Sequence, residues 1–134
     1  MRKNTLKSRK QIVRLVVLMV EVEQPEGISS RKLILETARH NVLTAYSGDD
    51  AVILLQRFPN VDLAIIHSEL EDEAFESTVR RLKEVRPSLY IVAISPVDFD
   101  KLEGVDAVLP SYDPQELLEF LAKRFEAATS DEST

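Results

Sequence analysis

Short apolar blocks recur along the chain between polar, turn-forming stretches, and five of them have the composition of buried β-strands. Each block is rich in Val, Ile and Leu, as expected of a strand that is covered on both faces. The strands are predicted at residues 12–22, 42–46, 62–67, 89–94 and 105–109.

Between these blocks, apolar residues return every three or four positions, which predicts amphipathic helices. The helices are predicted at residues 30–39, 49–58, 73–85 and 114–127, with a short one at 98–103. Ser29 or Ser30 can cap the first helix, and Asn41 is predicted to be its left-handed stop. Asp49 and Asp50 place negative charge in the first turn of the second helix, where the helix dipole favours it.

This alternation of strands and helices predicts an α/β fold with one parallel sheet. We expect a doubly wound, flavodoxin-like sheet of five strands in the order 2-1-3-4-5, with helices on both faces. The domain is predicted at residues 12–127, between an N-terminal arm (1–11) and a C-terminal tail (128–134). At 134 residues the chain suits one domain.

The composition argues against a disulfide-stabilised, a membrane-spanning or a secreted protein. The chain has no Cys, which excludes a disulfide framework and thiolate metal sites and suits a cytoplasmic location. The longest apolar stretch, residues 15–20, is too short to span a membrane. The N-terminus does not resemble a signal peptide, because its basic residues leave no apolar segment.

Charge is distributed unevenly. Residues 1–14 hold six basic side chains and no acidic one, whereas the whole chain has a formal net charge of −6. The remainder is therefore strongly acidic, which disfavours nucleic-acid binding through the folded body. The arm is expected to be a solubilising leader. Its alternative role is weak attachment to an anionic polymer or membrane surface.

Four segments in a fixed order resemble the receiver domains of bacterial response regulators (CheY-like). They are AYSGDDA at 45–51, DLAIIH at 62–67, IVAIS at 91–95 and YDPQELL at 112–118. In this family two acidic residues hold Mg²⁺, an Asp accepts the phosphoryl group, and a Ser or Thr and a Lys bind the phosphoryl oxygens. The resemblance implies the CheY-like fold and a role in two-component phosphorelay signalling.

Several reactive positions of the family differ in this chain. His67 stands where the phospho-acceptor Asp is expected, and the Lys position falls on Pro110 or Ser111. The acidic pair aligns with Val22 and Glu23. Ser95 keeps its hydroxyl. The resemblance therefore indicates a degenerate receiver, or pseudo-receiver, with Mg²⁺ binding weak or absent and no enzymatic activity.

Glu21 is a further acidic neighbour of this pocket, expected to point to the opposite face of the sheet if the strand continues regularly. His40 is predicted to interact favourably with the dipole at a helix C-terminus. Only 14 residues separate Ser95 from Pro110, about two helical turns fewer than receivers usually carry. The fourth helix is therefore expected to be shortened. Val108 aligns with the aromatic switch residue and has no ring.

These departures favour a phosphorylation-independent receiver that works as a protein–protein interaction module. The expected partner is a signalling protein such as a histidine kinase or another receiver, and a homodimer is also considered. The contact is expected on the Ser95–Pro110 face or on the loop at 68–75. No DNA-binding domain or membrane span is expected. Two alternatives keep site chemistry: His67 accepts a phosphoryl group, or His67 and Glu23 bind a metal ion.

Overall fold

The computed structural model describes residues 11–12, 14–21, 30–68, 74–95, 103–110 and 114–127. The strands are β1 (Gln11–Ile12), β2 (Val16–Val20), β3 (Asn41–Ala45), β4 (Leu63–His67), β5 (Tyr90–Ser95), β6 (Ala107–Pro110) and β7 (Glu126–Ala127). The helices are α1 (Ser30–Thr37), α2 (Gly48–Arg57), α3 (Ala74–Val85) and α4 (Pro114–Arg124). Among the described residues, no helix has the length and apolar content needed to cross a membrane.

Five of the described strands form one parallel sheet in the order β3-β2-β4-β5-β6. Because β1 lies outside this sheet, that order is the predicted 2-1-3-4-5 arrangement, and the prediction of a flavodoxin-like parallel sheet is confirmed. Consecutive parallel strands need a crossover connection, and α1, α2 and α3 supply those from β2 to β3, from β3 to β4 and from β4 to β5. The predicted short helix at 98–103 falls almost entirely outside the described residues.

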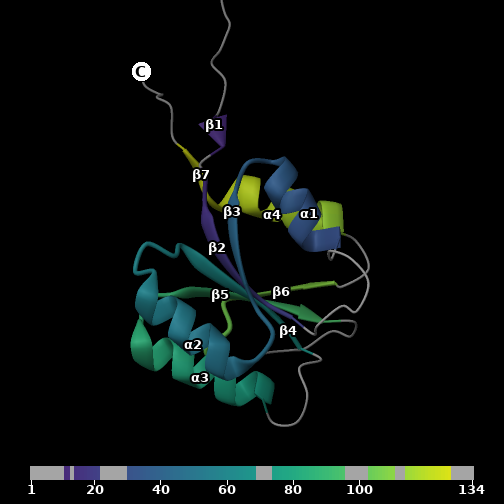
Figure 1. Cartoon of the computed structure of the whole chain (residues 1–134). Coiled ribbons are helices and arrows are strands. Elements are labelled where there is room, and N and C mark those ends of the chain that lie inside the picture. The colour runs from purple at the N-terminus through teal and green to yellow at the C-terminus, as the bar shows by residue number, and fades with distance from the viewer. Residues whose placement is uncertain are drawn as a thin grey trace, which may run out of the picture.

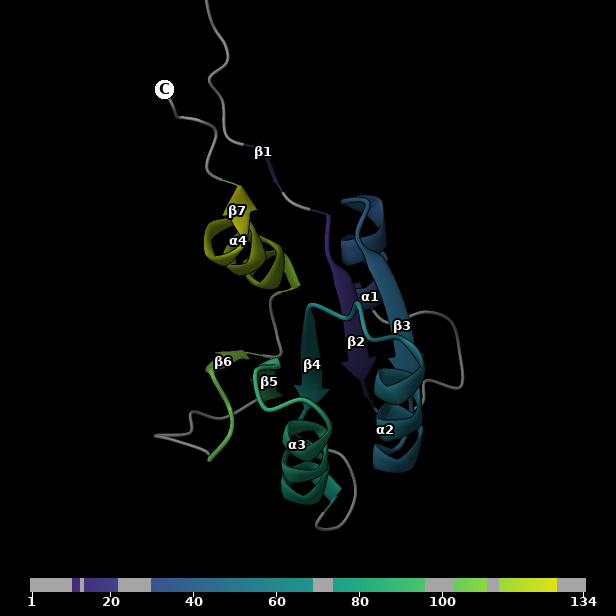
Figure 2. The same cartoon turned by 90° about the vertical axis from the view of Figure 1, so that its left-hand side faces the viewer.

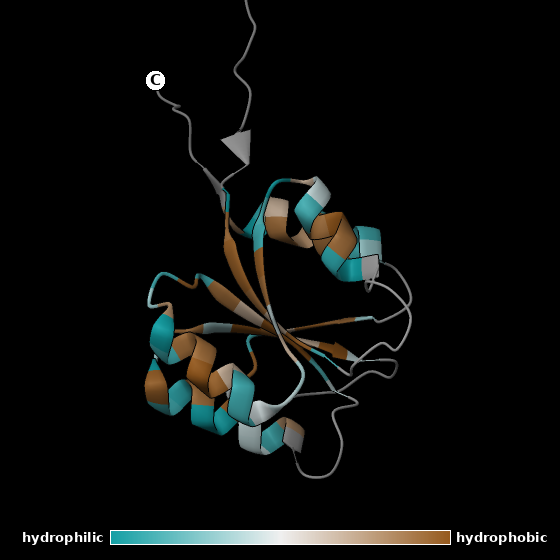
Figure 3. Cartoon of the chain, viewed as in Figure 1, coloured by the Kyte–Doolittle hydropathy of each residue, from teal (hydrophilic) through white to brown (hydrophobic). Residues whose placement is uncertain are grey.

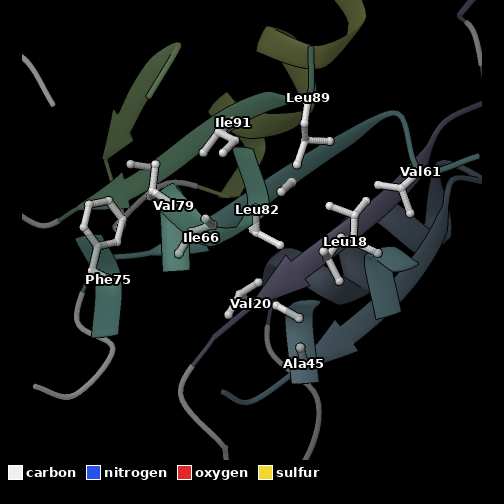
Figure 4. Close-up of a cluster of buried hydrophobic side chains, with 14 residues drawn as sticks. Leu18, Val20, Ala45, Val61, Ile66, Phe75, Val79, Leu82, Leu89 and Ile91 are labelled. Carbon is white, nitrogen blue, oxygen red and sulfur yellow. The ribbon is translucent and has the colours of Figure 1, made fainter. Parts of the chain in front are cut away.

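Helices cover both faces of the sheet: α1 and α4 lie on one side, and α2 and α3 on the other (Figures 1 and 2). Figure 3 shows hydrophobic residues along the strands between these two layers. Alternate strand residues enter two separate cores, because successive side chains point to opposite faces. The core under α2 and α3 includes Leu18, Val20, Ile66, Val79, Leu82 and Ile91 (Figure 4). The core under α1 and α4 includes Val17, Met19, Leu35, Ile65, Ile94 and Leu117.

An aspartate precedes each of the strands β4 and β6 and forms hydrogen bonds with the backbone of an adjacent strand. The Asp62 N–H donates to the carbonyl of Val16, and Asp62 Oδ2 accepts from the Val16 N–H, both at 2.8 Å. Asp106 makes the same pair of 2.8 Å bonds with Ile91, and Lys83 Nζ lies 3.4 Å from Asp106 Oδ2. Hydrogen bonds to a charged group contribute about 1.5–3 kcal/mol, so these aspartates help to set the strand register.

The predicted strand at 12–22 is divided in the structure. Ile12 pairs with Glu126, and Gln11 with Ala127, in the antiparallel β1–β7 pair, while the central strand begins at Val16. The same pairing explains why the last helix ends at Arg124 and not at residue 127: residues 126–127 are extended against β1. A long-range pairing of the two ends thus overrides the local apolar pattern.

Arg39, and not Asn41, has the left-handed backbone after α1, with φ of 74°. The Arg39 N–H donates to Glu36 O at 2.9 Å, and the His40 N–H to Leu35 O at 3.0 Å. This pattern closes a helix end in the Schellman manner. The prediction for Asn41 was wrong, because Asn41 already belongs to β3, where its N–H donates to Leu15 O.

The start of α2 agrees with the sequence. Ser47 caps the helix and accepts from the Asp50 N–H at 3.1 Å, and Asp49 and Asp50 lie in the first turn. A Cβ at Gly48 would overlap the hydroxyl of Thr78 on α3. Glycine at this position therefore lets α2 and α3 approach each other closely.

Candidate functional site at the carboxyl ends of the strands

Three of the predicted site residues end adjacent strands of the sheet. His67 ends β4, Ser95 ends β5 and Pro110 ends β6. His67 is in register with Ile94, and Ser95 with Pro110, so the three residues lie along one edge. The remaining two, Glu23 and Ser111, lie outside the described residues.

The strand register places the His67 and Ser95 side chains on different faces of the sheet. Paired residues of parallel strands project to the same side, and successive residues alternate. Ile94 belongs to the core under α1 and α4, so its partner His67 faces that side and Ser95 faces α2 and α3. Ser95 is buried and His67 is half-buried. The edge therefore does not present the imidazole and the hydroxyl on one surface.

Glu21 is a buried acidic group of this edge. It follows β2 directly, and its N–H donates to the carbonyl of Ala45 at 3.1 Å. Val20 is in register with Ile66, so continuing by one residue sets Glu21 beside His67 and on the same face. Glu21 is thus the acidic residue next to the strand-end histidine in the described structure. The expectation that it points to the opposite face was wrong, because the register of β2 and β4 sets it on the face of His67.

Arg31 of α1 is the ionic partner of Glu21. Arg31 Nη2 lies 3.5 Å from Glu21 Oε1, and the two side chains are only 13% and 3% exposed. Within the described structure, Glu21 Oε1 accepts no hydrogen bond. Sequence reasoning did not identify Arg31. The sequence did contain a signal for this pair. Arg31 lies in the first turn of a predicted helix, where a basic residue opposes the helix dipole, so a nearby acidic partner could have been expected.

Of the two metal-ligand candidates named from the sequence, His67 lies among the described residues and Glu23 does not. Mg²⁺ requires a nearly octahedral set of oxygen ligands, usually carboxylates and waters. Within the described ranges, no three His, Cys, Asp or Glu side chains come close enough to share a metal ion. Glu21 already faces a guanidinium, and the neighbouring strand ends in an imidazole.

His40 differs from its predicted role. It is 4% exposed, and its Nδ1 accepts the N–H of Leu15 at 3.0 Å. An accepting Nδ1 carries no proton, and burial lowers the pKa of His40 below its ordinary value of 6.5. The expectation of a charged partner for the helix dipole was wrong, because desolvation and the Leu15 N–H both favour the neutral ring.

The sequence also did not reveal a groove along α3. Its volume is about 430 Å³, with Phe75 and Val79 contributing apolar surface and Arg80 and Glu76 contributing charge. Gly104, between β5 and β6, also lines it. The groove thus lies on the Ser95–Pro110 side of the molecule, where the connection between strands is short.

No protein-family model and no curated protein sequence matches the chain. Solved structures do match it. A response regulator receiver domain protein from Clostridium thermocellum is 18% identical, with a TM-score of 0.68 over 83% of this chain and 94% of that one. The fold is that of a receiver domain.

Two further receiver structures show the same likeness. The receiver domain of the hybrid histidine kinase CckA is 21% identical, with a TM-score of 0.68 over 82% of this chain and 98% of that one. A CheY-like receiver protein from Methanospirillum hungatei JF-1 is also 21% identical, with a TM-score of 0.65 over 84% and 94%. Near-complete coverage of these receivers shows that the likeness extends over the whole receiver fold.

Proposed function

We propose that this chain is an atypical receiver domain that acts in two-component signalling by binding another protein, without accepting a phosphoryl group. The observation that carries the proposal is His67. The sheet register sets it at the end of the central strand β4, which is the position of the acceptor Asp in the family that the sequence resembles. The fold supports the receiver role, and the residue at its centre supports the loss of phosphorylation.

The energetic cost of the altered groups supports this proposal. An aspartyl phosphate needs a carboxylate to attack and a cation to stabilise the phosphoryl oxygens. Here an imidazole replaces the carboxylate, and uncharged Pro110 ends β6 where the Lys is expected. Loss of one stabilising donor alone typically raises a barrier by about 3–4 kcal/mol, or about a hundredfold or more in rate. Loss of the nucleophile in addition removes the reaction itself.

The surface along α3 supports a role in binding another protein. The groove along α3 and the turn at Glu103 and Gly104 form an uneven, partly apolar surface on the side between Ser95 and Pro110. We propose that a signalling protein, such as a histidine kinase or another receiver, contacts this side in the cytoplasm. The domain would then act through that partner and not as an enzyme.

The phosphorylation part of the proposal is tested by incubating the full chain with acetyl phosphate and Mg²⁺ and measuring its intact mass at neutral pH. No gain of a phosphoryl group is expected for the chain or for a His67→Gln control. A phosphoryl group that is present in the chain and absent in the control would instead establish the second candidate function, in which His67 is the acceptor. A stable phosphoryl group elsewhere at the sheet edge would also overturn the proposal.

The binding part is tested separately, by pairwise two-hybrid assays against the histidine kinases and receivers of the same genome. Binding is expected to survive His67→Gln, because phosphorylation is not used. It is expected to weaken with Arg80→Glu in the groove and to persist with Arg57→Glu, an exposed basic residue on α2. Binding that is lost with His67→Gln, or equally affected by both charge reversals, would contradict this account.

A further inference from the structure

The Glu21–Arg31 ion pair is almost fully buried at the carboxyl edge of the sheet. Glu21 is 2% exposed at the carboxyl edge of the sheet, where a buried carboxylate is costly unless a cation or hydrogen bonds compensate it. Arg31 supplies that cation across 3.5 Å. In the described structure Glu21 Oε1 has no hydrogen-bond donor, so the compensation at this oxygen is ionic.

The location of Arg31 strengthens this point. It lies in the first turn of α1, which contains no acidic residue. Positive charge near a helix N-terminus is unfavourable, because that end carries the positive pole of the dipole. A half-buried arginine held there is costly in both respects, and the Glu21 carboxylate supplies the negative charge that offsets part of this cost.

We propose that the Arg31 guanidinium is a built-in counter-ion that takes the place of a divalent cation against Glu21. The carboxylate is neutralised by the protein's own side chain, so the edge keeps one charge state whether or not a metal ion is in solution. A guanidinium and a divalent cation would then compete for the same carboxylate. This inference goes beyond the proposed function, because it concerns metal dependence and holds whatever protein the domain binds.

The test is Mn²⁺ titration of the full chain, followed by paramagnetic broadening of amide NMR signals. The wild type is expected to show no saturable broadening at residues 20–21 and 64–67. Arg31→Gln is expected to show saturable broadening there, because a positive charge has left the site. Lys32→Gln removes the adjacent positive charge of α1 and is expected to behave like the wild type.

The double variant Glu21→Gln/Arg31→Gln tests whether Glu21 is the metal ligand. It is expected to lose the Mn²⁺ binding that Arg31→Gln gains. The proposal is overturned if Arg31→Gln binds Mn²⁺ no more tightly than the wild type, or if the wild type already binds it through Glu21.

If Arg31→Gln is unfolded while the double variant folds, Arg31 is needed to neutralise Glu21, as proposed. If both are unfolded, Arg31 supports the fold in another way, and the proposal fails. The phosphorylation and two-hybrid results do not depend on either outcome.

Discussion

Lowering the pH from about 8 to about 5.5, the range over which histidine titrates, should destabilise this protein through His40. Protonation converts both ring nitrogens into donors. The Leu15 N–H, now 3.0 Å from the accepting Nδ1, would then lose its acceptor. A buried donor without a partner costs about 1–3 kcal/mol. The charged ring would also remain in a site that is 4% exposed.

The sign of the effect follows from the direction of the pKa shift. Burial lowers the pKa of His40 in the folded state below 6.5, the value of the unfolded chain. The unfolded state therefore binds more protons in the window between the two pKa values. The stabilising effect is fully present above pH 6.5 and is lost as the pH falls through that window, by up to about 1.4 kcal/mol per pH unit.

The assay is urea unfolding followed by circular dichroism at several pH values, on the wild type and on His40→Gln. Glutamine offers an amide oxygen to the Leu15 N–H but does not titrate. For each protein the free energy of unfolding is plotted against pH, and the difference between the two slopes is the contribution of His40. The reasoning is refuted if the His40→Gln slope equals that of the wild type, or if NMR titration places the His40 pKa at or above 6.5.

Two further substitutions test packing and strand register. Asp106→Ala should lower the free energy of unfolding by about 2–3 kcal/mol, because the Ile91 N–H loses a charged acceptor, whereas Glu103→Ala on an exposed turn should change it by less than about 0.5 kcal/mol. Gly48→Ala should cost about 1–3 kcal/mol through overlap with the Thr78 hydroxyl, and Thr78→Ala in the same chain should recover part of that loss. Both are measured by urea unfolding at neutral pH.

Specific results would contradict these expectations. If Asp106→Ala and Glu103→Ala lowered the free energy of unfolding equally, the hydrogen bond from the Ile91 N–H to Asp106 would not stabilise the pairing of β5 and β6. Additive effects of Gly48→Ala and Thr78→Ala would mean that the two residues do not collide, since overlapping groups give non-additive free energies.

The sequence by itself determined the elements of the fold. Short apolar runs such as 63–66 are buried on both faces, and this composition distinguishes strands of a covered parallel sheet from the one-sided strands of other sheets. The start of α2 was also readable, because Asp49 and Asp50 interact with the helix dipole within one turn of chain. Their physical causes are local, so the local sequence contains them.

The tertiary structure decided the interactions between distant segments. The ionic partner of Glu21 is Arg31, on a helix reached through residues that are not described, and the acceptor of the Leu15 N–H is His40. Each pairing depends on how a helix packs on the sheet and on the register of strands, which sequence spacing does not specify. The same holds for the β1–β7 pair, whose strands lie at opposite ends of the chain. The sequence thus identified the strand-end residue His67, while only the packed structure showed that its acidic neighbour Glu21 lies 3.5 Å from the guanidinium of Arg31.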